Sequence, residues 1–138
     1  MNSPPREPPP SVDHSSAGGG GALRARAQGV RSEALGAALA ELDPDLLRWA
    51  DSFIFGDVWT GDEIGFEDRM LVAIVALAAT GQTRQLRNYI HGALQSGIPS
   101  ERLHGALKML VVYAGFPTAI DALVVLQEAR VKYADASR

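Results

Sequence analysis

The chain of 138 residues contains no cysteine, so any chemistry it performs uses other side chains. A thiol nucleophile, a redox cysteine pair, a disulfide framework and a cysteine zinc site are all excluded. Imidazole chemistry is left to three histidines, His14, His91 and His104. No His-x-x-x-His or His-x-x-Glu spacing joins any of them to a second ligand. We therefore expect no metal centre.

Tyr89 and His91 are acid–base candidates on a helix predicted over residues 83–96. One apolar stripe follows the helical spacing and comprises Leu86, Tyr89, Ile90, Ala93 and Leu94. Tyr89 is therefore either a core tyrosine with a hydrogen-bonded hydroxyl or a pocket hydroxyl that acts as donor or acid. His91 shares a different face with Arg87, and two positions on a helix rotate it by about 200° from Tyr89. We expect His91 at the surface, unless an interface folds that face into a neighbouring site.

Two acids, Asp57 and Glu67, stand near the same segments of sequence. The ordinary interpretation of each is a helix cap or a partner of Arg69. The functional interpretation is a general base. Both interpretations stay open from the sequence.

The elements that position these residues all have helical patterns. No useful length of the chain alternates with period two, so strands are not supported. Asp43-Pro44, Gly81, Gly97 and Gly115 provide helix boundaries. Helices are predicted over residues 30–42, 44–55, 67–80, 83–96, 99–115 and 117–134, with a loop over 56–65. The fold class is therefore all-α.

Residues 1–30 form a Pro/Gly/Ser-rich arm that we expect to be disordered, with Arg24 and Arg26 isolated in it. Residues 31–138 form the helical domain. The net charge is −3 and no Lys/Arg-rich run occurs in the folded part, so we expect no nucleic-acid partner. The most apolar run is too short to span a bilayer and the start of the chain does not resemble a signal peptide. A cytoplasmic protein without a membrane partner is the expectation.

The helix predicted over residues 99–115 is apolar on two sides. One stripe is Leu103, Ala106, Leu107, Leu110 and Ala114, and the other is Gly105, Met109, Val112 and Phe116. A helix of this kind is buried on both sides. In so small a domain, the second side is expected to face a ligand cavity or another subunit.

Five segments occur in an order and spacing typical of one family. They are Phe53-Ile54-Phe55-Gly56-Asp57-Val58-Trp59, then Arg69 before an apolar helix ending Ala79-Thr80-Gly81, then Leu86-Arg87, Ala93-Leu94-Gln95-Ser96-Gly97-Ile98 and Val112-Tyr113-Ala114-Gly115-Phe116-Pro117-Thr118-Ala119. Over about residues 46–133 the chain resembles the carboxymuconolactone decarboxylase family of the alkylhydroperoxidase-D-like superfamily. The resemblance implies an all-helical bundle that assembles as a homo-oligomer, a trimer or hexamer. Its active site would lie between helices near a subunit interface.

The sequence departs from the family pattern at polar positions. Tyr89 stands where the decarboxylase branch has a histidine, Gly61 where it has an arginine, and Gly105 and Met109 where it has a glutamate and a glutamine. The peroxidase branch needs a cysteine pair, so this chain is not a thiol peroxidase. The pocket is expected to be larger, drier and less able to hold an anionic diacid.

These features predict a cofactor-independent enzyme of lyase or isomerase type that acts on a small molecule. The reaction would be decarboxylation, dehydration or cyclisation of a lactone, β-keto acid or aromatic intermediate, in specialised metabolism. Such reactions proceed through an enolate, which needs a donor near its oxygen and a base. We expect Tyr89 as donor and His91 or Glu67 as base.

The residues expected to contact the substrate are Phe55, Trp59, Arg87, Met109 and Tyr113. The alternative is a catalytically inactive binding or structural subunit that has kept the oligomer. An open cavity lined by Tyr89, Met109 and Trp59 would favour the enzyme. A cavity filled by side chains would favour the structural subunit.

Overall fold

Every regular element of the structure is a helix. The computed structural model describes residues 19–136, and no strand occurs among them. The elements are α1 (Gly19–Gln28), the 3₁₀ turn η1 (Gly29–Arg31), α2 (Ser32–Leu42), α3 (Pro44–Trp49), the π-helix η2 (Ala50–Val58), α4 (Phe66–Ala79), α5 (Thr83–Gln95), α6 (Ser100–Lys108), α7 (Leu110–Tyr113) and α8 (Phe116–Ala136). The all-α prediction is confirmed. None of the described helices is both long and apolar enough to cross a membrane.

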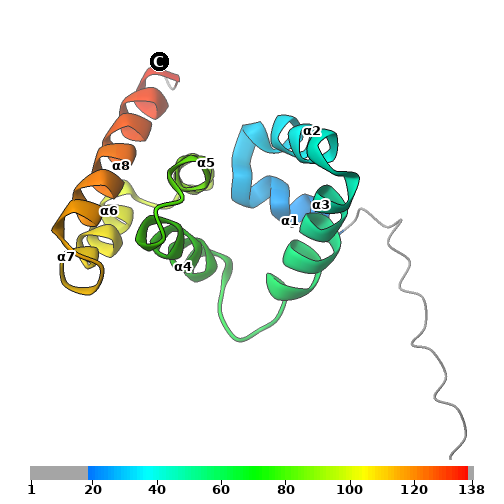
Figure 1. Cartoon of the computed structure of the whole chain (residues 1–138), viewed down its shortest axis with the longest axis horizontal. Helices are drawn as coiled ribbons and strands as arrows, with labels where there is room; N and C mark the ends of the chain where they lie inside the picture. Colours follow the sequence, from blue (N-terminus) through cyan, green and yellow to red (C-terminus); the bar gives the residue numbers. More distant parts are fainter. Residues whose placement is uncertain (1–18, 137–138) are drawn as a thin grey trace, which may run out of the picture.

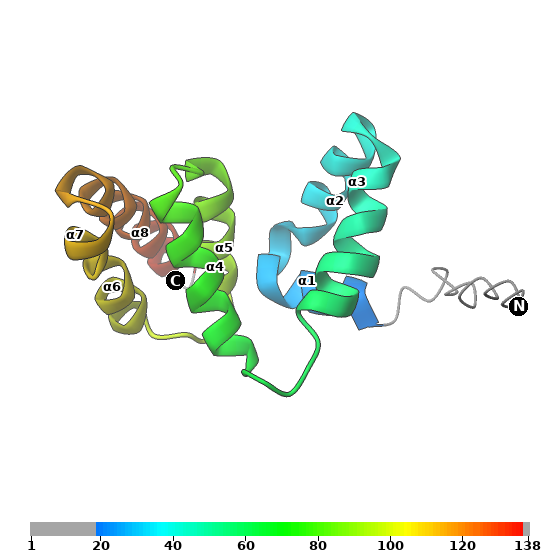
Figure 2. The ribbon, with the colours of Figure 1, turned by 60° about the horizontal axis from the view of Figure 1, so that its bottom comes forward.

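The helices form two groups joined by the loop that follows η2 (Figure 1). α1, α2 and α3 lie on one side and α6, α7 and α8 on the other, with the α4–α5 hairpin between them. Figure 2 shows the same division after rotation. α1 packs against both η2 and α5, so it connects the first group to the hairpin.

The main core lies where α4, α5, α6 and α8 meet. Its largest fully buried aliphatic side chains are Met70, Ile74, Ile90, Leu103, Leu107 and Leu126. The apolar stripe predicted on the helix after Thr83 is confirmed as a core face, because Leu86, Ile90 and Leu94 are all buried. Tyr89, on the edge of that stripe, is half-buried and packs against the core.

The boundary between α2 and α3 forms where the sequence predicts it. Asp43 has an extended backbone that ends α2, and its Oδ1 accepts a hydrogen bond from the Asp45 N–H at 2.9 Å. Pro44 takes the first helical position, where its missing N–H costs no hydrogen bond. This turn therefore needs no long-range contact to form.

Two predicted helices differ from the structure. The helix expected over residues 44–55 continues as η2 to Val58, with the wide π spacing shown by a 2.9 Å bond from the Trp59 N–H to the Ile54 carbonyl. The helix expected over residues 99–115 breaks at Met109 into α6 and α7. There the backbone bonds tighten to i→i+3, with the Val112 N–H donating to the Met109 carbonyl at 3.1 Å.

The predicted disordered arm does not extend to residue 30. Residues 1–18 lie outside the described part of the chain, and α1 and η1 occupy residues 19–31. Two glycines permit the close packing of α1: a Cβ at Gly20 would overlap the Asp51 carbonyl, and one at Gly92 would overlap the Ala27 carbonyl. The position of α1 is therefore set by close contacts between its backbone and the backbones of η2 and α5. A local sequence pattern does not reveal such contacts.

Candidate functional site

An aromatic cluster joins η2, α4 and α5. Phe55 and Trp59 have ring centroids 5.0 Å apart, Trp59 and Phe66 are separated by 6.1 Å, and Trp59 and Tyr89 by 6.3 Å. The wide turns of η2 end at Trp59 and leave it in the centre of the cluster. Three of the residues predicted for the site, Phe55, Trp59 and Tyr89, therefore lie together.

Phe55 supports this cluster without offering a surface to a ligand, because it is buried. Trp59, Phe66 and Tyr89 are only partly buried. Phe66 was not among the predicted site residues, although it is an apolar residue just before the acidic first turn of a predicted helix. The surfaces that a flat or apolar ligand can contact are those of Trp59, Phe66 and Tyr89.

The Tyr89 side chain is influenced by two residues of α1, Gln28 and Arg24. These two residues are themselves joined, because Arg24 Nη1 donates to Gln28 Oε1 at 3.1 Å. Burial raises the pKa of Tyr89, and the Gln28 contact and the Arg24 charge oppose that rise. The phenol is therefore neutral at pH 7 and keeps a proton that it can donate.

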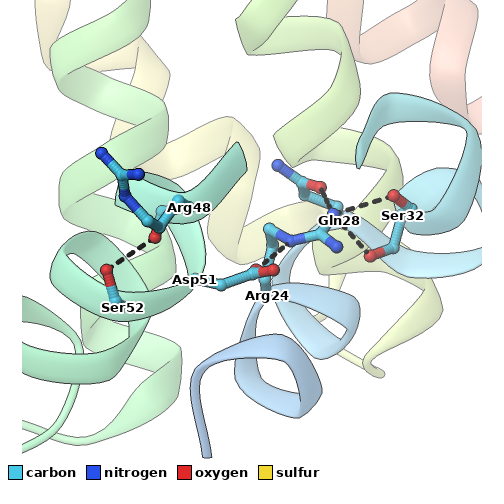
Figure 3. Close-up of polar contacts among 6 residues, drawn as sticks. All are labelled: Arg24, Gln28, Ser32, Arg48, Asp51 and Ser52. Carbon is cyan, nitrogen blue, oxygen red and sulfur yellow. Dashed lines mark hydrogen bonds and ion pairs between the residues drawn. The ribbon is translucent and has the colours of Figure 1, made fainter. Parts of the chain in front are cut away.

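Arg24 is the centre of a polar network that joins α1, α2 and η2 (Figure 3). Its Nε donates to Asp51 Oδ1 at 2.6 Å, and its Nη1 donates to the Ser32 carbonyl at 2.8 Å and to Ser32 Oγ at 3.1 Å. Arg24, Gln28 and Ser32 are all buried. The expectation that Arg24 is isolated in a flexible arm is wrong, because the carboxylate of η2 and the groups of α1 and α2 satisfy its buried guanidinium.

Arg26, predicted to lie in the disordered arm, also has a defined contact. Its guanidinium carbon lies 3.8 Å from the centroid of the Phe66 ring, a cation–π contact. Two arginines of α1 thus bring positive charge to the aromatic cluster. The signal that could have found α1 is the run of residues 22–28, which contains only Ala, Leu, Arg and Gln, all good helix formers.

His91 is buried, which corrects the expected surface position. Within the described chain its Nε2 has no hydrogen-bond partner. Burial lowers the pKa of His91, and the charges of Arg31, Lys132 and Arg87 lower it further. The imidazole is therefore neutral at pH 7. It shares a helix face with Arg87, as predicted, and does not join the Tyr89 cluster.

Glu67 and Arg87 are both engaged in ion pairs. Glu67 Oε1 accepts from Arg102 Nη1 at 2.8 Å, and Arg87 Nη2 lies 3.8 Å from Glu128 Oε2. Arg69 is not the partner of Glu67, because it bonds to the Ile64 and Gly61 carbonyls and to Glu63. The structure therefore does not bring either predicted base, His91 or Glu67, to Tyr89.

Met109 and Tyr113 lie at the α6–α7 corner, on the far side of the α4–α5 hairpin from α1 (Figure 1). Both side chains are exposed, together with Val112 and Phe116 of the predicted second face. The expected cavity lined jointly by Tyr89, Met109 and Trp59 is therefore not formed within the described part of one chain. Among those residues, no three His, Asp or Glu side chains gather where they could hold a metal.

Comparison with known proteins identifies a family and a curated relative. The model of the carboxymuconolactone decarboxylase family matches residues 44–128. A 4-carboxymuconolactone decarboxylase of Acinetobacter baylyi is 26% identical over 107 residues, covering 72% of this chain and 80% of that protein. The family match includes the aromatic cluster and excludes α1 and α2.

Proposed function

Because this chain belongs to the carboxymuconolactone decarboxylase family, we propose that it is a decarboxylase-like enzyme that works without a cofactor. The substrate is a lactone, a β-keto acid or an aromatic intermediate. The observation that carries the proposal is the partly buried hydroxyl-bearing ring of Tyr89, whose centroid lies 6.3 Å from that of Trp59 in the aromatic cluster. A planar substrate packed on Trp59 would place its carbonyl oxygen next to that hydroxyl.

Tyr89 supplies the hydrogen-bond donor that an enolate requires. On decarboxylation the bond between the carboxylate carbon and the adjacent carbon breaks, and CO₂ leaves. The electron pair stays on the organic fragment and moves onto its carbonyl oxygen. A donor aimed at this oxygen lowers the barrier, and loss of one such donor typically costs about 100- to 1,000-fold in kcat. A proton from solvent water then adds to the carbon, and hydroxide is left to be neutralised by the buffer.

The placement of the acids and histidines favours decarboxylation over dehydration or cyclisation. Dehydration and cyclisation need a base to remove a proton, whereas His91 is buried and Glu67 is paired with Arg102. Loss of CO₂ needs no such base, because the carboxylate itself releases the electron pair. A lone donor such as Tyr89 is therefore sufficient for the bond-breaking step.

The charge around the cluster supports an acid as substrate. Arg26 lies over Phe66, and Arg24 acts on Tyr89 from beneath. A carboxylate entering this region meets positive charge from α1, although the family arginine is replaced by Gly61. The proposed substrate is therefore a carboxylic acid with a flat or apolar body.

The enzyme is also proposed to be a homo-oligomer. Met109, Val112 and Phe116 form an exposed apolar patch on the α6–α7 corner and the start of α8, which we call the corner patch. Contiguous apolar surface of this kind is typical of protein interfaces. A second copy covering the corner patch would satisfy the two-sided apolar pattern of this segment.

A ligand screen tests the proposal. The full chain is heated with 4-carboxymuconolactone, other lactones, β-keto acids and aromatic acids, and CO₂ release is measured for every compound that raises the Tm. A ligand at 100 times its Kd stabilises the fold by about 2.7 kcal/mol, a shift easily measured in a small domain. Stabilisation and CO₂ release with one class of acid are expected. No response across the panel would contradict the proposal.

A further inference from the structure

A cavity lies where the end of α5, the start of α6 and the C-terminal part of α8 meet, and we call it the α5–α8 cavity. It shares no lining residue with the aromatic cluster around Trp59. Its volume of about 310 Å³ is at the lower end of the range of about 300–1,000 Å³ typical of small-molecule sites. The cavity is therefore a separate place with room for one small ligand.

The inner wall of the α5–α8 cavity is apolar and belongs to the main core. Leu94 and Ile98 line it and are buried, with 6% and 5% exposed. The turn that joins them is closed by backbone hydrogen bonds, from the Gly97 N–H to the Leu94 carbonyl at 3.1 Å and from the Ile98 N–H to the Ala93 carbonyl at 3.0 Å. Gly97 has the positive φ of +88° that this helix ending requires. The wall is thus fixed by the fold and suits the apolar body of a ligand.

The outer wall of the cavity carries an uncompensated positive charge. Arg130 lines the cavity from α8 and is exposed, and within residues 19–136 it forms no ion pair or hydrogen bond. Ser100, at the first position of α6, lines the opposite side, and none of the lining residues is acidic. A guanidinium whose donors are unoccupied matches a carboxylate in charge and in geometry. The two walls together fit a ligand with an apolar body and one carboxylate.

We propose that the α5–α8 cavity binds a small carboxylic acid with an apolar body, and that Arg130 pairs with its carboxylate. An inorganic anion is disfavoured, because it would leave the apolar wall of Leu94 and Ile98 in contact with water. The site does not depend on the proposed role of Tyr89. Arg130 follows residue 128, where the family match ends, so the charge that defines this site lies outside the matched segment.

The test uses benzoate as the acid and follows the ²H,¹⁵N-labelled full chain in TROSY NMR spectra at constant ionic strength. The backbone amides of Gly97 and Ser100 report on the α5–α8 cavity, and the indole N–H of Trp59 reports on the aromatic cluster. We expect saturable shifts at Gly97 and Ser100. Benzamide, which has the ring without the charge, and inorganic phosphate, which has charge without the ring, are each expected to bind at least about tenfold more weakly.

Arg130→Met tests the pairing, because it removes the charge and keeps an apolar stem on an exposed position. The Kd for benzoate, read from Gly97 and Ser100, is expected to rise at least about fivefold. Arg84→Met is the matched control, since Arg84 is an exposed arginine at the start of α5 that does not line the cavity. It is expected to bind benzoate as the wild type does.

Each contrary result overturns the proposal in a different way. Shifts confined to the Trp59 indole would place the acid at the aromatic cluster alone. Equally tight binding of phosphate would reduce the cavity to a general anion site, and equally tight binding of benzamide would remove the carboxylate from recognition. Equal weakening in Arg130→Met and Arg84→Met would show an effect of net charge only.

Discussion

Arg24 donates to the buried Gln28 and Ser32 and to the partly buried Asp51, so its removal costs each of them a hydrogen bond. We expect Arg24→Met to lower the free energy of unfolding by about 1–3 kcal/mol, since Asp51 is only partly buried and regains some water. Arg48→Met is the matched control, because Arg48 forms an exposed pair with Asp45. It is expected to change stability by about 0.5 kcal/mol or less. Equal losses in urea denaturation would contradict the network as drawn in Figure 3.

The lowered pKa of His91 makes the free energy of unfolding depend on pH. Its pKa is lowered in the folded chain, so the unfolded chain binds more protons below the ordinary value of about 6.5. Stability is therefore full above that pH and falls as the pH drops toward the folded pKa. His91→Gln is expected to flatten this fall in Tm between pH 8 and pH 5.5. The exposed His104→Gln is expected to retain the wild-type slope, and a slope that follows His104 would refute the assignment.

The packing of α1 depends on two glycines rather than on apolar side chains alone. A Cβ at Gly92 would overlap the Ala27 carbonyl, so Gly92→Ala pushes α1 away from α5. We expect a loss of about 1–3 kcal/mol by chemical denaturation, the range for overpacking. Gly105→Ala is the control, because nothing lies within 4 Å of a Cβ there. It should stabilise α6 by about 0.5–1 kcal/mol, and a similar loss in both variants would argue against the close crossing.

Sequence patterns predicted the helices whose ends depend only on neighbouring residues. Asp43-Pro44 predicts its own turn, and the stripe containing Leu86 and Ile90 predicts the buried face of α5. The position of α1 could not be predicted, because it depends on contacts with residues far along the chain, Asp51 and Gly92. Of the candidate site residues, the family motif predicted Phe55, Trp59 and Tyr89, which lie together in the aromatic cluster. It could not predict Arg26, which reaches the Phe66 ring through tertiary packing.

Many large apolar side chains lie exposed on the surface of the described chain. The corner patch of Met109, Val112 and Phe116 has exposed fractions of 57%, 77% and 63%. We expect the wild-type chain to elute as an oligomer in size-exclusion chromatography with light scattering. The Val112→Asp variant is expected to elute with a lower molar mass, because the charge disrupts the interface. Val30→Asp is the control, since Val30 is an exposed valine on η1. A monomeric wild-type chain would contradict the proposed assembly.

The central claim is that the neutral hydroxyl of Tyr89 stabilises the developing oxyanion during decarboxylation. The most direct test is the rate of CO₂ release from the acid that the ligand screen selects, compared between wild type, Tyr89→Phe and Tyr133→Phe. Removal of the hydroxyl at Tyr89 should reduce kcat by about 100-fold or more, with little change in Tm, while Tyr133→Phe should retain wild-type turnover. Turnover unchanged in Tyr89→Phe would contradict the account.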